Sequence, residues 1–210
     1  RYFLLDKGFY EVINSPFVSN SSDKSIKVDN PLDTNRRYLR TNIINSLLDN
    51  LVFNERRQKD SIKLFEISDI YISKNNEIIK TRRLSVIASG RVGHNYEDFS
   101  KKINKTYLTK IFQDALPSEN FVFEVLPRDS MNTKIKNEII GCEVDISNFS
   151  PDVLNYKEKA KPPNNFIQYR SISDLPYSKR DLSFSIKDQT QCKPLERFIL
   201  NFKDNLLEEV

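Results

Sequence analysis

The residues of this sequence with the clearest chemical potential are three arginines in one turn-rich segment. Arg36, Arg37 and Arg40 lie in VDNPLDTNRRYLRTNI, directly before a strongly amphipathic stretch. A guanidinium is always charged and presents a planar fork of donors, so loop arginines can hold a phosphate or a carboxylate. The segment therefore allows three interpretations: phosphate ligands in an active site, contacts to RNA, or solvated charge at a subunit boundary.

The chain contains one histidine, His94, in the loop GRVGHNYED between a predicted strand and a predicted helix. An imidazole titrates near neutral pH and can act as a general acid or base. No second metal ligand lies near it in the sequence, so a loop or cap position is the better interpretation. A self-sufficient enzyme built around His94 is a rival hypothesis, which loss of an activity on mutating His94 would support.

The cysteines and glycines indicate neither a nucleophile nor a nucleotide loop. Cys142 lies in the apolar stretch EIIGCEVDI and Cys192 opens the last predicted helix, so both are interpreted as buried thiols. Their separation matches no metal-ligand spacing. Gly90-x-x-Gly93 alone is neither a P-loop nor a dinucleotide fingerprint. The carboxylates show neither EF-hand nor facial-triad spacing, and the sequence therefore predicts no metal site and no catalytic residue.

The composition is that of a folded, reduced protein. The chain has 210 residues, of which 38% are hydrophobic, and this is enough for a sizeable core. Its 33 basic and 29 acidic residues give a net charge of +4, which is compatible with an RNA partner without demanding one. No apolar run reaches the length of a membrane span, and we expect a cytoplasmic setting. The absence of an initiator methionine and the end inside a predicted helix suggest that the chain is cut from a longer one.

Hydrophobic periodicity predicts the elements that must position these residues. The best helix is 41–58, where apolar residues recur every three or four positions. A second helix is predicted at 96–115, with an inward face made of Phe99, Ile103, Leu108, Ile111 and Phe112. A short helix at 1–8 is expected to end at Gly8. Strands are predicted at 9–18 with an interruption at Pro16, and at 26–28, 62–72, 83–89, 121–126 and 138–146.

The C-terminal part has a different pattern. Residues 155–165 read NYKEKAKPPNN, a polar stretch with paired prolines that indicates a linker. After it, 180–186 alternates strictly and predicts a strand, and 193–209 predicts an amphipathic helix. A strand and a helix without partner strands cannot bury their apolar faces, so we expect this part to be weakly ordered, domain-swapped or packed on the first.

Several segments resemble, in order, the β subunit of bacterial phenylalanine–tRNA ligase. The family pattern has Asn-Pro, a polar turn, an arginine before a helix that ends in Asn-x-x-Arg, and a Phe-Glu-x-Gly strand. The matching positions are Asn30, Pro31, Arg40, Thr41, Asn54, Arg57, Phe65 and Glu66, with Ser68 in place of the glycine. KGFYEVINSPFV and GRVGHNYEDF also resemble family segments. ISDLPYSKRDLSFSI is similar to the start of the family's anticodon-binding domain, with matches at Pro176, Arg180 and Asp181.

The resemblance implies an α+β fold: a class II synthetase-like, mixed but mainly antiparallel sheet flanked by helices, followed by an incomplete ferredoxin-like βα unit. It implies a synthetase-like module at 1–154, a linker at 155–172 and the first half of the anticodon-binding domain at 173–210. The histidine–proline and glycine-rich elements that the family usually shows near 127–141 are missing.

The resemblance also implies that this module is a non-catalytic portion of an ATP-dependent ligase. A class II active site needs an arginine after its motif 2 strand, whereas here KLFEIS is followed by Asp69-Ile70-Tyr71-Ile72. The fragment is therefore expected to bind no cofactor itself, with ATP and Mg²⁺ used by the whole complex. Arg36 and Arg37 are then interpreted as solvated charge, and Arg40 as fixing the turn or meeting the α subunit.

The partners implied are the α subunit, in a heterotetramer, and tRNA(Phe), with no DNA and no membrane. The residues expected at the α-subunit interface, or in the structural turn before it, are Arg40, Leu47, Leu51 and Phe53. An equal alternative for the helix is that its stripe covers its own sheet. Lys179 and Arg180 are candidate tRNA contacts, and an equal alternative for Arg180 is a pair with Asp181 or a neighbour that closes the domain. The basic runs 80–83 and 157–161 are interpreted as solvated charge in preference to contacts with tRNA phosphate. The alternative function is a stand-alone, synthetase-derived RNA-binding or regulatory protein.

Overall fold

The structure is a computed structural model of residues 1–210, and the chain divides into two units, Arg1–Ala160 and Lys161–Val210. It describes residues 1–149 apart from 76, 96, 117–120, 129–130 and 132. It also describes residues 156, 169, 171, 176, 178 and 180–202. The expected linker at 155–172 therefore lies almost entirely outside the described residues, and its boundaries stay a prediction.

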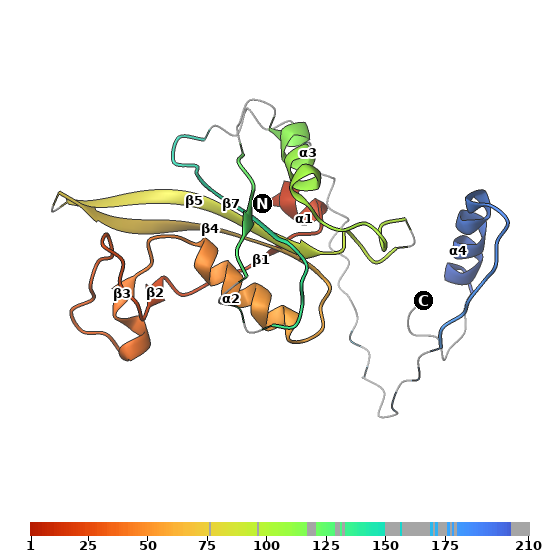
Figure 1. The fold of residues 1–210 in the computed structure, drawn as a ribbon, viewed down its shortest axis with the longest axis horizontal. Coiled ribbons are helices and arrows are strands. Elements are labelled where there is room, and N and C mark those ends of the chain that lie inside the picture. The colour runs from red at the N-terminus through yellow and green to blue at the C-terminus, as the bar shows by residue number, and fades with distance from the viewer. Residues whose placement is uncertain are drawn as a thin grey trace. The chain divides into compact units, whose positions relative to one another are not determined.

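The first unit is built on a five-stranded sheet with the order β1-β4-β5-β7-β6 (Figure 1). The strands are β1 (Tyr10–Glu11), β4 (Ser61–Lys74), β5 (Glu77–Gly90), β7 (Ile139–Asp145) and β6 (Glu124–Leu126). Only β1 pairs in parallel, with β4, and the other pairings are antiparallel. This confirms the expected α+β class with a mixed, mainly antiparallel sheet.

The β4–β5 hairpin is the longest element and passes beyond the sequence-based prediction at both ends. Its register runs from Ser61 opposite Gly90 to Lys74 opposite Glu77, whereas the predicted strands were 62–72 and 83–89. Asn75 adopts a positive φ of 53° in the turn. At the other end Gly90 has a φ of 93°, and a Cβ there would lie 1.9 Å from the Asp60 carbonyl oxygen. Glycine is therefore required at this close approach.

The two faces of the sheet are covered by different helices, because successive side chains of a strand point to opposite faces. Helix α2 (Ile44–Glu55) packs on one face, where Leu47 and Leu51 share a cluster with Leu64 and Ile87. Helices α1 (Tyr2–Asp6) and α3 (Lys105–Ala115) cover the other face (Figure 1).

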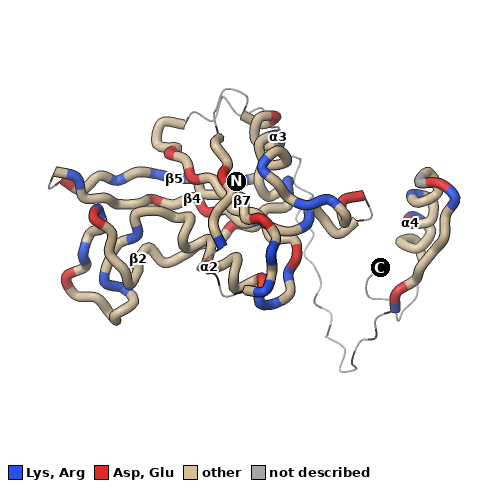
Figure 2. The backbone as a smooth tube through the Cα atoms, viewed as in Figure 1, with Lys and Arg blue, Asp and Glu red and all other residues tan. Residues whose placement is uncertain are grey.

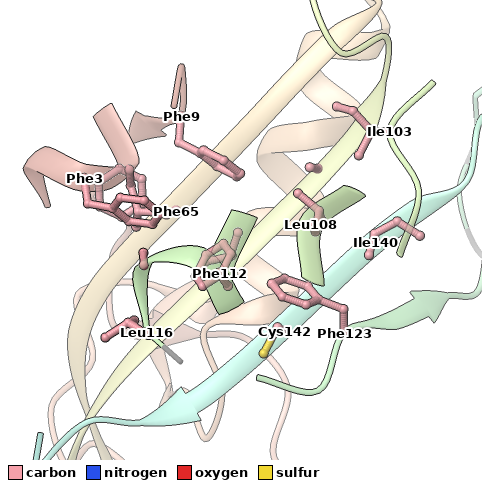
Figure 3. Packing of buried hydrophobic residues seen from close by; sticks show 14 residues of the cluster. Phe3, Phe9, Phe65, Ile103, Leu108, Phe112, Leu116, Phe123, Ile140 and Cys142 are labelled. Atoms are coloured by element: carbon pink, nitrogen blue, oxygen red, sulfur yellow. The ribbon is translucent and has the colours of Figure 1, made fainter. Parts of the chain in front are cut away.

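Aromatic rings fill the core beneath α1 and α3 (Figure 3). The Phe112 ring lies 6.0 Å from that of Phe3, 4.9 Å from that of Phe121 and 5.0 Å from that of Phe123, measured between centroids. The contacts with Phe3 and Phe123 have the edge-to-face geometry that aromatic pairs favour. Phe112 thus ties the helix to the N-terminal segment and to the segment before β6.

The helix predicted at 96–115 begins only at Lys105, and the placement of Phe99 was wrong. The side chain of Asn104 accepts a 2.8 Å hydrogen bond from the Tyr107 backbone N–H and caps the helix there. Asn95 makes a similar bond with the Asp98 N–H, which stabilises a turn instead of a helix. Phe99 is consequently 49% exposed, with the Arg91 guanidinium 3.9 Å from its ring centroid.

Other predicted strands and helices also differ from the structure in their boundaries. The strand expected at 9–18 is two short strands in separate sheets, because β2 (Phe17–Val18) pairs with β3 (Tyr38–Leu39). The strand expected at 26–28 is a single bridge between Lys27 and Tyr38. A one-turn 3₁₀ helix, η1 (Thr34–Arg36), precedes β3. The helix predicted at 41–58 is shorter at both ends and spans Ile44–Glu55. After it the backbone turns at Gln58, which has a φ of 61°.

In the second unit the described elements are η3 (Gln189–Gln191) and α4 (Cys192–Leu200). The strand predicted at 180–186 is wrong, because these residues join no ladder among the described residues. Leu182, Phe184 and Ile186 are 70%, 53% and 38% exposed. Alternation predicts an extended segment, whereas a strand also requires a hydrogen-bonding neighbour. The end of the predicted helix, 203–209, lies outside the described residues.

The contrast between Phe112 and Phe99 makes a matched test of the core. Phe112→Ala removes a fully buried ring and is expected to lower the free energy of unfolding by about 3–5 kcal/mol. Phe99→Ala removes an exposed ring and is expected to cost less than about 1 kcal/mol. Urea unfolding followed by circular dichroism measures both. Equal losses in the two variants would contradict the placement of Phe99 outside the core.

Candidate functional site

The polar centre of the first unit is an ion pair between Arg40, which follows β3, and Glu66 on β4. Their side chains are 3% and 2% exposed. Arg40 Nη2 donates to Glu66 Oε1, and Nη1 donates to Glu66 Oε2 at 3.3 Å and to Ser46 Oγ at 3.3 Å. Each of these charges would be costly to bury alone, so the pair locks the chain before α2 onto the sheet.

Two amide side chains extend this pair towards the surface. Asn14 Nδ2 donates a 2.8 Å hydrogen bond to Glu66 Oε2, and Asn50 Nδ2 donates a 2.8 Å bond to Asn14 Oδ1. Because a carboxylate only accepts hydrogen bonds, Glu66 fixes which way the Asn14 amide points. Asn14 in turn fixes the orientation of Asn50 on α2.

Glu66 is the first member of a polar row that crosses the sheet under α2. It lies opposite Ser85 on β5, and Ser85 lies opposite Glu143 on β7. Glu143 Oε2 accepts the backbone N–H groups of Ile43 and Ile44 at 2.8 and 2.9 Å. A carboxylate satisfies the free N–H groups at a helix N-terminus and complements the helix dipole. Glu143 Oε1 also accepts a 3.0 Å bond from Arg83 Nη1.

A second, partly buried ion pair holds the other end of α2. The Glu55 side chain, 1% exposed, accepts Arg128 Nη2 at 2.7 Å and Nη1 at 3.1 Å. Arg128 Nη2 also donates to Ser89 Oγ at 3.3 Å. The sequence analysis did not predict roles for Glu55, Arg128 and Glu143. For Glu143 a signal was available, because a glutamate in the middle of the apolar strand EIIGCEVDI indicates a carboxylate that faces inward and is paired.

The position expected to hold a phosphate-binding arginine is occupied by an acidic residue with internal partners. Asp69 pairs with Lys80 at 2.9 Å and with Arg82 at 3.5 Å, both on the neighbouring strand. The hydrogen bond that Lys80 donates to the Asp69 carboxylate raises the pKa of Lys80 above its ordinary value. Arg83 turns to the other face and bonds Glu143. The basic run 80–83 is therefore divided between two faces and engaged within the chain.

Charge in the first unit is interspersed: Lys and Arg positions and Asp and Glu positions are both scattered along the backbone (Figure 2). Arg36 makes an exposed pair with Asp33 at 3.4 Å, and Arg37 is exposed. Arg180 is exposed, whereas Lys179 and the run 157–161 lie outside the described residues. The tRNA-binding roles of Lys179 and Arg180 stay predictions.

The expected interface residues on α2 have different surroundings. Leu47 and Leu51 are fully buried against the sheet of this chain. Phe53 is 54% exposed, and the Arg57 guanidinium lies 3.3 Å from its ring centroid. Arg40 is internal to the unit. Of the four residues, Phe53 is the one with substantial surface to offer a partner.

The residues interpreted as non-catalytic lie apart from one another. His94 is exposed in its loop, with Nδ1 3.8 Å from Asp60 Oδ1. Cys142 is buried in the core, and burial raises the pKa of its thiol to about 11. Cys192 is half-buried in the second unit.

Among the described residues no group of three His, Cys, Asp or Glu side chains could hold a metal ion. Within that same part of the chain, no helix combines the length and apolar character needed to cross a membrane.

Comparison with known proteins identifies the family. A family model described as "Phenylalanyl tRNA synthetase beta chain CLM domain" matches residues 1–144. The chain therefore belongs to the phenylalanyl-tRNA synthetase β-chain family, as its resemblance implied.

Named relatives agree with this assignment. The phenylalanine–tRNA ligase β subunit of Porphyra purpurea chloroplasts is 24% identical, over 100% of this chain and 33% of that protein. The subunit of Fusobacterium nucleatum is 27% identical, over 89% of this chain and 27% of that protein. This chain thus spans about a third or less of the length of these relatives. A solved pyrrolysyl tRNA synthetase from Desulfitobacterium hafniense matches 69% of this chain and 62% of its own at 13% identity, with a TM-score of 0.47, too slight a likeness for an argument.

Removing one member of the buried pair should destabilise the first unit strongly. Arg40→Met leaves the Glu66 charge buried without its counter-ion, and is expected to lower the free energy of unfolding by about 3–5 kcal/mol. Arg36→Met breaks an exposed pair and is expected to cost less than about 1 kcal/mol. Adding Glu66→Met to Arg40→Met should recover part of the loss, as measured by urea unfolding. Wild-type stability in Arg40→Met would show that the pair does not hold the unit together.

The Cys142 thiol should be protected until the unit unfolds. Its pKa is raised from 9.0 to about 11, first by burial and then by Glu124 and Glu143. Because the folded pKa exceeds the unfolded one, the protonated thiol contributes stability that is complete below pH 9.0 and is lost as the pH rises towards about 11. Alkylation near neutral pH, read by mass spectrometry, should label Cys192 first and Cys142 only with added denaturant. Fast labelling of Cys142 in the native chain would contradict its burial.

Proposed function

We propose that this chain is a non-catalytic part of a phenylalanine–tRNA ligase β subunit, acting as a scaffold that associates with the α subunit. The whole enzyme attaches L-phenylalanine to tRNA(Phe) with ATP and Mg²⁺ in the cytoplasm, as an assembly of α and β subunits. This chain supplies no group to the reaction itself. Family membership and the names of the curated relatives support the proposal.

The observation that carries the non-catalytic assignment is the internal use of charge on both faces of the sheet. Glu66 and Glu143 are each engaged by an arginine, and Glu143 is also held by the first N–H groups next to α2. Asp69 is engaged by the basic residues of the neighbouring strand. A site that stabilises a triphosphate needs free cations aimed at the ligand. These cations instead neutralise carboxylates of the same chain.

The surface best suited to the α subunit is formed by α1 and β1. Tyr2 and Leu5 are 50% and 44% exposed on α1, and Tyr10 and Ile13 are 72% and 92% exposed on β1 and just after it. β1 is also the edge of the five-stranded sheet. Exposed aromatic and aliphatic groups beside a sheet edge mark a site of association. This surface was missed in the sequence because its apolar residues show no long periodic run.

Assembly with the α subunit tests the proposal. Co-expression with the matching α subunit should give a complex on size-exclusion chromatography. Ile13→Glu should weaken that complex at least about fivefold, because a charge would be buried at the contact. Leu32→Glu, at a residue that is 85% exposed on another loop, should leave it unchanged.

One result would count against the scaffold role and another against the proposed interface. The first is a stable monomer that binds RNA and ignores the α subunit, which would favour the stand-alone RNA-binding alternative. The second is an equal effect of Ile13→Glu and Leu32→Glu, which would place the interface elsewhere.

A further inference from the structure

A polar hollow of about 310 Å³ lies between the outward face of α2 and the segment 14–19, which includes β2. Ser46, Asp49 and Asn50 line it from the helix, and Asn14 and Phe17 line it from the other side. Residues 46, 49 and 50 share one helix face, since side chains three and four positions apart are neighbours. Phe53 follows on the same face, one turn further on.

The buried ion pair organises this hollow from below. Arg40 donates to Ser46, Glu66 accepts from Asn14, and Asn14 accepts from Asn50. Because one N–H of the Asn50 Nδ2 group donates to Asn14, the orientation of the amide is fixed and its Oδ1 atom can accept a hydrogen bond from a ligand. The amides are therefore held in one orientation before any ligand arrives, which reduces the cost of binding.

Among the described residues, the hollow contains two free acceptors for hydrogen bonds. Within the described part of the chain, neither the Asp49 carboxylate nor Asn50 Oδ1 has a hydrogen bond or ion pair, and both belong to residues that line the hollow. Asp49 is the one charged residue in the lining. Phe17 adds a ring that is 39% exposed. Negative charge, a fixed amide oxygen and an aromatic face together fit a planar cation with several donors.

We propose that this hollow binds a guanidinium group, presented as an arginine side chain of a partner polypeptide. An arginine is preferred to a lysine because its planar fork can reach both Asp49 and Asn50 while its face lies against Phe17. Phe53 on the next turn supplies an apolar contact for residues beside that arginine. The inference goes beyond the scaffold role and does not require the partner to be the α subunit.

The test is a titration of the ¹⁵N-labelled chain followed by NMR. The side-chain amide signals of Asn14 and Asn50 should shift saturably with Nα-acetyl-arginine amide. The neutral isostere Nα-acetyl-citrulline amide should bind about tenfold more weakly, because it lacks the charge. Nα-acetyl-lysine amide and AMP complete the panel, as an ammonium and as a nucleotide.

Matched variants locate the binding groups. Asp49→Asn should lower the affinity for the arginine probe about tenfold, whereas Asp114→Asn, at an exposed carboxylate on α3, should leave it unchanged. Phe17→Leu should cost roughly threefold for arginine and little for lysine. Circular dichroism of each variant checks that the fold is retained.

The proposal is overturned by any of three results. These are the absence of saturable shifts at Asn14 and Asn50, citrulline binding as tightly as arginine, and full affinity in Asp49→Asn. Stronger shifts with AMP than with the arginine probe would indicate a nucleotide site and would also overturn the proposal. None of these outcomes alters the co-expression result, so failure here is distinguishable from failure of the scaffold role.

Discussion

The pairing of buried charges around α2 is the constraint on which the first unit depends. Leu47 and Leu51 supply the apolar contact with the sheet, but apolar contact has little directionality. The Arg40–Glu66 pair before the helix and the Glu55–Arg128 pair at its end define where it lies. Burying these charges is costly unless every partner is present, so a displaced helix would leave ions unpaired in the interior.

The same ion pairs distinguish the charged groups that the chain uses internally from the surface that it can offer to a partner. Glu66 and Glu143 face the sheet interior and are engaged by Arg40, Arg83 and the N-terminal end of α2. These carboxylates are therefore neutralised within the chain itself. The outward side of α2 and the β1 edge carry the available surface, which is the arrangement expected of a scaffold.

The two faces of the sheet are built on different principles. The face under α1 and α3 is an aromatic core around Phe112, where close packing is the main source of stability. The face under α2 combines a smaller apolar cluster with the row Glu66, Ser85 and Glu143. The polar row fixes the position of α2 on the sheet. Through hydrogen bonds, Glu66 also fixes the orientation of Asn14, and Asn14 fixes that of Asn50 in the surface hollow.

The sequence by itself determined the class of fold, the β4–β5 hairpin, the apolar stripe of α2 and the family, because each is written in local periodicity or in a run of matching residues. It misplaced Phe99, since side-chain caps at Asn95 and Asn104 outcompeted a longer helix. It also predicted a strand at 180–186 that has no described neighbour with which to pair. Only the tertiary structure decided the partners of the charges: Arg40 meets Glu66 across 26 positions and Ile43 meets Glu143 across 100. Such pairings depend on which strands lie side by side and in what register, and local periodicity specifies only the face on which a side chain lies.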